Sequence, residues 1–138
     1  MSSAPGEIIR RARSLVGTRF RPQGRDPRTG LDCIGLVLCA FDLGAGEFRK
    51  DYRLRGAHLR EVEEALAQRF RRVSARRSRA ADIFLCRISA DQTHLAINCG
   101  ESFIHADARI RRVVETPGRP EWTIVAAFRT RSLKRRSN

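Results

Sequence analysis

The segment GLDCIGLVLCAF, residues 30–41, places two thiols in an otherwise apolar run, and its first residues have the features of a helix start. Asp32 is a residue type that caps helix N-termini, so Cys33 falls in the first turn. The start of a helix carries about half a positive charge, which stabilises a thiolate. We therefore predict a helix that presents Cys33 as a nucleophile with a lowered pKa. Cys39 lies nearly two turns further on, and we interpret it as a packing residue.

Composition indicates one globular domain with a strongly basic surface. The chain has 138 residues, 41% of them hydrophobic, and a formal net charge of +13. Such a charge attracts nucleic acid, anionic wall polymers or acidic lipid, and it equally suits a solvated surface. The sequence contains no stretch of membrane-spanning length and no signal peptide, so we expect a protein that is cytoplasmic as synthesised. The four cysteines match no paired zinc-binding pattern, and we expect free thiols.

The order of patterns along the chain predicts an α+β fold. Apolar residues recur at helical spacing over residues 6–16 and 58–70, and residues 18–31 read as a loop. Short segments rich in β-branched and aromatic residues follow. We predict a mainly antiparallel sheet of five to six strands, arranged as a meander, with the helices on one face. We expect a single domain over residues 1–130 and a basic, mobile tail over 131–138.

Two histidines in consecutive predicted strands are candidates for the base that a nucleophilic thiol needs. If the chain turns around Gly100 and Glu101, strand alternation brings His94 and His105 close together on one face, with Asp107 on the same side as His105. A slip of one residue in register would separate them. The third histidine, His58, is interpreted as a surface or capping residue.

The sequence resembles the NlpC/p60 family of cell-wall cysteine peptidases from about residue 6 to residue 128. A Gly-Thr-x-aromatic loop precedes an Asp-Cys-x-Gly-Leu-Val helix start. An Ala-x-Asp strand then introduces the strand THLAINC, which is followed by the strand SFIHAD. The resemblance implies a papain-like fold with Cys33 as the nucleophile, His94 as the general base and His105 as the residue that orients His94. It implies peptidoglycan stem peptides as substrates, an acylated Cys33 as the intermediate, and no metal or organic cofactor.

The sequence also departs from the family pattern around the expected substrate-binding residues. Phe20 stands where many members have tyrosine, Arg19 replaces a proline, and Ile34 stands where serine is common. In several members the tyrosine, the serine and the aspartate before the cysteine bind the amino end of the substrate. Only Asp32 is kept, either to bind a cationic amine or to cap the helix.

Small members of the family without an export signal occur in phage tails and gene-transfer particles. By analogy, this chain could assemble with phage-tail-like structural proteins and act in the periplasm. One alternative is a thiol acyltransferase or amidase that acts on another amide. Another is a basic module with an inactive site that binds nucleic acid or the cell wall, for which the arginine-rich stretch over residues 71–79 is the main argument. Cys33 reactivity towards iodoacetamide below neutral pH would separate a live site from a dead one.

Overall fold

The computed structural model describes residues 4–48 and 59–131. Its elements are α1 (Pro5–Ser14), β1 (Arg25–Asp26), β2 (Gly30–Leu31), α2 (Cys33–Ala40), a 3-10 turn η1 (Ala45–Glu47), α3 (Leu59–Arg69), β3 (Phe70–Val73), a 3-10 turn η2 (Ala75–Arg77), β4 (Ile83–Ser89), β5 (Gln92–Asn98), β6 (Ser102–Asp107), β7 (Arg112–Pro117) and β8 (Thr123–Thr130). The predicted helices and the five predicted strands are all present. The proposed tail lies outside the described residues except for Arg131.

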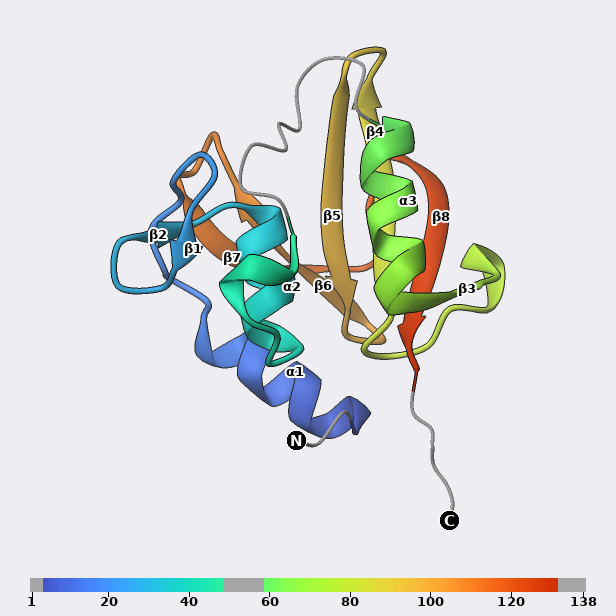
Figure 1. The fold of residues 1–138 in the computed structure, drawn as a ribbon, viewed down its shortest axis with the longest axis horizontal. Helices are drawn as coiled ribbons and strands as arrows, with labels where there is room; N and C mark the ends of the chain where they lie inside the picture. The colour runs from blue at the N-terminus through green and yellow to red at the C-terminus, as the bar shows by residue number, and fades with distance from the viewer. Residues whose placement is uncertain (1–3, 49–58, 132–138) are drawn as a thin grey trace.

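The main sheet is antiparallel throughout, with the strand order β3-β8-β4-β5-β6-β7 (Figure 1). The predicted meander is therefore correct from β4 to β7 and wrong for β8, which returns to pair with β4. Ala126, Ala127 and Phe128 are buried on both faces of β8, which suits a strand inside the sheet rather than at its edge. The strand β3 was not predicted, because Phe70 continues the apolar spacing of α3.

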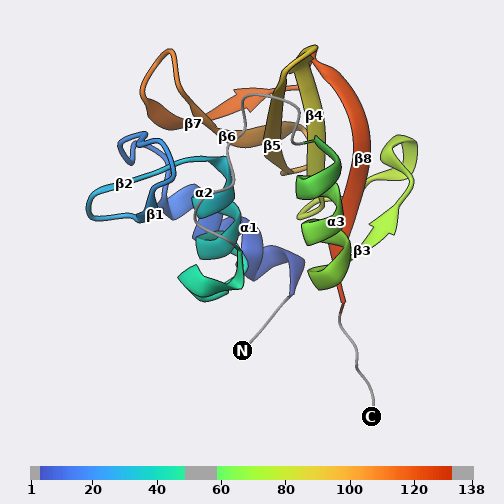
Figure 2. The same ribbon diagram turned by 45° about the horizontal axis from the view of Figure 1, so that its top comes forward.

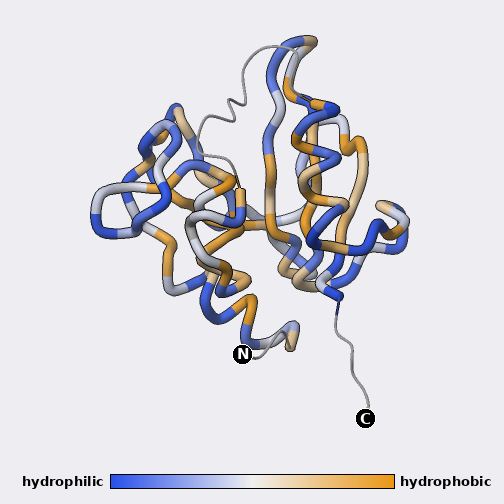
Figure 3. Tube along the Cα trace, in the orientation of Figure 1, coloured by the Kyte–Doolittle hydropathy of each residue, from blue (hydrophilic) through white to orange (hydrophobic). Residues whose placement is uncertain are grey.

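The helices cover one face of the sheet, as predicted (Figure 2). Ile8 and Ala12 from α1, Val62 and Leu66 from α3 and most of α2 form one apolar core with the inward residues of the strands. Figure 3 shows this concentration of apolar residues where α2 meets the sheet. None of the described helices is long and apolar enough to cross a membrane.

The opposite face of the sheet carries a smaller apolar cluster made by strand residues alone. Its buried members are Phe84, Cys86, Ala96, Phe103 and Ala127. Trp122, before β8, and Ala75, in η2, pack against it. Leu95 and Ile104 point into the helix-side core. His94 and His105, which are next to them in β5 and β6, therefore lie on this opposite face.

β5 and β6 diverge after a short paired stretch, and α2 packs against both strands at this point (Figure 1). Their ladder contains only the pairs Ile97–Ile104 and Asn98–Phe103. The turn between them is as predicted, since the Cys99 N–H donates to the Ser102 carbonyl over 2.8 Å and Gly100 has a φ of 96°. The start of α2 is thereby placed beside the unpaired edge of β5.

Candidate active site

Asp32 caps the helix that carries the candidate nucleophile, as predicted. Its Oδ1 accepts a hydrogen bond of 2.8 Å from the Gly35 N–H, and its Oδ2 accepts one of 3.1 Å from the Gln23 N–H. The first turn of α2 also packs tightly on the preceding loop. A Cβ atom at Gly35 would lie 2.1 Å from the Gly24 carbonyl oxygen, so only glycine fits. Cap and close packing together fix the direction in which α2 begins.

A buried ion pair adds to this cap. The Arg25 guanidinium donates to Asp32 Oδ1 over 2.8 Å, and the two side chains are only 3% and 5% exposed. Burial raises the pKa of Asp32, although Arg25 and the two backbone N–H groups favour its charged form. Both oxygens of Asp32 are therefore occupied by groups of this chain. Binding of a substrate amine by Asp32 stays a prediction, and its role as a helix cap is observed.

Cys33 lies at the first position of α2 and is fully buried. Burial raises the pKa of its thiol well above the usual value, and the adjacent Asp32 charge raises it further. The N–H of Leu95, Arg25 and the N–H of Cys33 itself act in the opposite direction but are weaker. The expectation that the helix start lowers this pKa is therefore wrong, because burial and Asp32 outweigh the helix dipole. A raised pKa disfavours the thiolate and argues against reactivity of Cys33 towards iodoacetamide below neutral pH.

The two strand histidines meet as the sequence predicts. His94 Nε2 and His105 Nδ1 are 2.9 Å apart, although the backbones of β5 and β6 are not paired at this level. Trp122 packs edge-on against both rings, with centroid distances of 5.1 Å to each. Leu95, which follows His94 in β5, is among the groups that lower the pKa of the Cys33 thiol, and both Leu95 and Cys33 belong to the helix-side core. His94 and His105 meet on the opposite face of the sheet.

Asp107 lies next to His105 and favours one of its tautomers. Its Oδ1 accepts hydrogen bonds from the N–H groups of Arg109 and Ile110 over 2.8 and 3.0 Å, while its Oδ2 lies 4.0 Å from His105 Nε2. A carboxylate at this position favours the His105 tautomer that is protonated on Nε2. With that tautomer, His105 Nδ1 would accept the hydrogen bond from His94 Nε2.

Both histidines are neutral at physiological pH. Burial lowers the pKa of His94 to about 3, and a positive charge on His105 would lower it in the same direction, whereas Asp107 opposes the shift. Burial also lowers the pKa of His105, again opposed by Asp107. A neutral imidazole is the form that can accept a proton, as a general base must.

The lowered pKa of His94 predicts a loss of stability in acid. Unfolded His94 would titrate near its ordinary value of 6.5. The unfolded state therefore binds a proton first as the pH falls from 6.5 towards 3, and folded protein is lost. Between pH 7 and 4.5 we expect a decrease of about 2–3 kcal/mol in the free energy of unfolding from this group. Urea titrations of the wild type and His94→Gln at both pH values measure it, and equal decreases in the two proteins would contradict it.

The structure assigns no role to the other residues singled out in the sequence. Ile34 is fully buried in the helix-side core, so only its backbone is offered to the site. Phe20 is half-buried, packs on that core and forms an isolated bridge with Leu31. Cys39 and Cys99 are partly exposed free thiols. His58 lies outside the described residues. Among the described side chains, no three His, Cys, Asp or Glu residues are grouped as a metal site.

Arg25, Asp107 and Trp122 contribute to the site beyond the predicted set. Asp107 shares its strand face with His105, and this alternation was visible in the sequence. Trp122 is the only tryptophan of the chain, but nothing local places it on the histidines. The pairing of Arg25 with Asp32 depends on the loop conformation between β1 and β2, which no sequence pattern specifies.

Structural comparison identifies this α+β fold as that of NlpC/p60 domains. The peptidoglycan hydrolase SagA domain superposes with a TM-score of 0.59 at 21% identity, covering 83% of this chain and 89% of that one. RipB, a peptidoglycan hydrolase from Mycobacterium tuberculosis, gives 0.60 at 23%, covering 91% of this chain and 63% of that one.

RipD from the same organism, described as a non-catalytic NlpC/p60 protein adapted to peptidoglycan binding, gives a TM-score of 0.61 at 19% identity, covering 94% of this chain and 98% of that one. No family model and no curated protein matches the chain by sequence. The fold is therefore one that serves both hydrolysis and binding, and the choice between them depends on the site residues.

Proposed function

We propose that this protein is a cysteine hydrolase that cleaves amide bonds in peptidoglycan peptides through a thioester on Cys33. One observation carries the proposal: His94 on β5 and His105 on β6 meet over 2.9 Å, and α2, which begins at Cys33, packs against both of these strands. A domain that only binds the wall needs no buried thiol beside an oriented pair of neutral imidazoles. Similarity to the two peptidoglycan hydrolases supports the choice of substrate class.

The proposed reaction uses only groups of this chain. His94 Nδ1 takes the thiol proton as the Cys33 sulfur attacks the amide carbon. The N–H groups of Cys33 and Ile34 at the start of α2 stabilise the oxyanion. His94 then gives the proton to the leaving amine, which departs and leaves a thioester. Water, deprotonated by His94, attacks the thioester, and the carboxylic acid leaves as the Cys33 thiol is restored.

Product analysis tests the reaction and its specificity. Digestion of purified peptidoglycan is expected to release peptides with new amino and carboxyl ends and to create no new reducing sugar ends. Mass spectrometry of the products identifies the bond that is cut. Products carrying an acyl group transferred to an added amine would favour the acyltransferase alternative. Absence of any product, with the wall still bound, would favour a binding role of the kind described for RipD. Assembly into a phage-tail-like or gene-transfer particle stays a prediction.

A further inference from the structure

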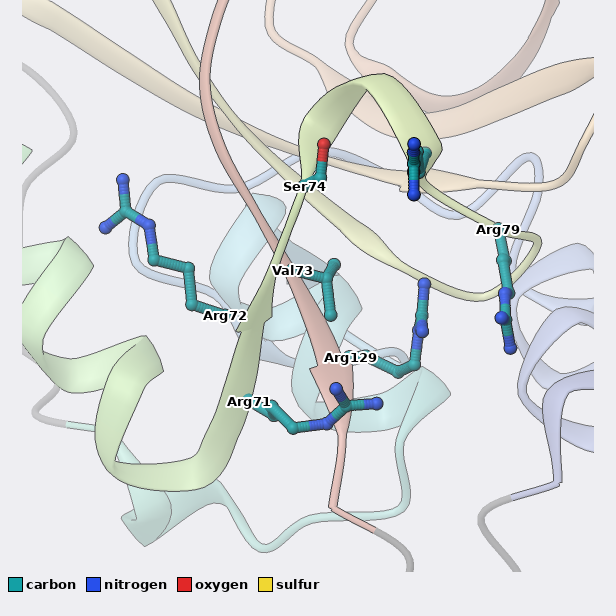
Figure 4. A pocket seen from close by; sticks show the side chains of 7 residues that line it. Arg71, Arg72, Val73, Ser74, Arg79 and Arg129 are labelled. Carbon is teal, nitrogen blue, oxygen red and sulfur yellow. The ribbon is translucent and has the colours of Figure 1, made fainter.

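A hollow of about 250 Å³ lies at the edge of the sheet, and its walls are mostly arginine (Figure 4). We define the arginine hollow by Arg71 on β3, Arg77 in η2, Arg79 before β4 and Arg129 on β8. Ser74 adds a hydroxyl group, and a neighbouring hollow of about 380 Å³ is lined by Ser74, Arg76 and Arg77. Such a concentration of one charge at a concave place in a domain indicates a site for anions.

Two of these arginines face each other directly. Arg71 and Arg129 are partners in the register of β3 and β8, and Figure 4 shows both side chains on the same side of the strands, with Arg72 pointing away. Like charges directly opposite in a ladder are destabilising unless something lies between them. Arg129 is fixed by Asp82, a buried carboxylate that it holds with two hydrogen bonds of 2.9 Å. Two of the arginines that line the hollow have carboxylate partners, since Arg129 pairs with Asp82 and Arg72 pairs with Glu63. Among the described residues, Arg71, Arg77 and Arg79 form no salt bridge with a carboxylate.

The arginine hollow and the histidine pair are on the same face of the sheet. Arg129 alternates with Phe128, which belongs to the helix-side core, and shares its face with Ala127, a member of the smaller cluster. Trp122, which packs on both histidines, and Ala75, beside Arg76, cover this same cluster. Arg119 joins the two regions, since it donates to the Ala75 carbonyl over 3.1 Å and stacks on Phe84. A path over one surface therefore leads from the hollow to the histidines.

The length of this path matches a short peptide. β8 is two strands away from β5, which is roughly 10 Å across the sheet. Asp82, the partner of Arg129, is level with Asn98, and His94 lies four residues further along β5, which is roughly 13 Å. A peptide chain of about five extended residues spans the diagonal.

We propose that the arginine hollow binds carboxylates of the acidic peptides of peptidoglycan, outside the bond that is cut. Arginine pairs with carboxylates through two parallel hydrogen bonds, which suits a small anionic group better than a diffuse charge. The position on the face of the histidine pair favours the substrate itself over an unrelated polymer. This inference rests on the proposed function for the identity of the ligand and adds a second point of attachment to it.

The test measures binding without catalysis, so it separates this inference from the proposed reaction. Cosedimentation of the Cys33→Ala protein with sacculi stripped of phosphate polymers gives an apparent affinity. Arg71→Glu combined with Arg77→Glu is expected to weaken binding about tenfold or more, because two charge-assisted contacts become repulsive. The matched control is Arg10→Glu with Arg60→Glu, which changes the net charge equally on the helix side and is expected to weaken binding less than threefold.

Two further arms identify the ligand. Conversion of the sacculus carboxylates to amides is expected to weaken wild-type binding to the level of the double variant. Duplex DNA at the same ionic strength serves as the phosphate probe. The inference would be overturned if the arginine-hollow double variant and the control double variant lost the same affinity for sacculi. Unchanged binding of the wild type to amidated sacculi would also overturn it. If the arginine-hollow double variant binds DNA more weakly but binds sacculi as the wild type does, the hollow is a nucleic-acid site and the inference is overturned. Unchanged turnover in Cys33→Ala would instead refute the proposed reaction.

Discussion

Replacing Cys33 with alanine is expected to reduce peptide release from peptidoglycan by a factor of about 10³ or more, because no other group can form the thioester. Cys33 is fully buried in the helix-side core, so the substitution also removes packing. A loss of about 1 kcal/mol in stability is the expected scale for one buried sulfur atom, which leaves the fold intact. Turnover is measured by the rate at which new amino groups appear.

Cys39→Ala is the matched control for this experiment. It changes a second cysteine of the same helix, partly exposed and away from the histidines. Its turnover is expected to stay within about twofold of the wild type. Both variants are checked by thermal unfolding, so that loss of activity is not confused with loss of fold. Wild-type turnover in folded Cys33→Ala would remove the cysteine mechanism.

The start of α2 could be predicted from sequence because its determinants are local. Asp32 caps the helix through Gly35, three residues later, and both residues are part of one motif. The turn at Gly100 and strand alternation place His94 and His105 on the same face, and both features are local in sequence. In each case, residues close in sequence determine the geometry.

Features that depend on distant segments were not predictable in the same way. β8 lies between β3 and β4, so it pairs with strands that are distant in sequence. The turn residues next to β8 carry no information about these partners. The pKa of Cys33 was predicted in the wrong direction, because the helix dipole is a local feature and burial is a property of the whole fold. The arginine-rich stretch could be recognised from the sequence. The position of Arg129 opposite Arg71 could not, because it depends on the pairing of β3 with β8.

The sheet itself explains how a thiol from one face and imidazoles from the other can work together. Cys33 belongs to the helix-side core, while His94 and His105 lie on the face of Phe103 and Trp122. A continuous ladder would separate them. Because β5 and β6 pair at only two positions and then diverge, the edge of β5 is open to the start of α2. The proposed site therefore depends on the divergence of these two strands.

Removing the positive partner of Asp32 is expected to have the largest effect on stability. Arg25→Met leaves a carboxylate buried at 5% exposure without the guanidinium that neutralises it. Loss of one partner of a buried ion pair costs about 3–5 kcal/mol, a large part of the stability of an ordinary domain. Because Asp32 also positions the first turn of α2, turnover should fall together with stability. Urea unfolding followed by the fluorescence of Trp122, the sole tryptophan, measures the change.

Arg28→Met provides the matched control, because Arg28 pairs with Asp26 in the same loop but with side chains 88% and 43% exposed. An exposed pair of this kind contributes at most about 1 kcal/mol. Adding Asp32→Asn to Arg25→Met should recover about half of the loss or more, since asparagine keeps the helix cap and removes the buried charge. If Arg25→Met unfolds at the same urea concentration as Arg28→Met, the ion pair does not hold the start of α2, and the cap and the Gly35 packing alone must do so.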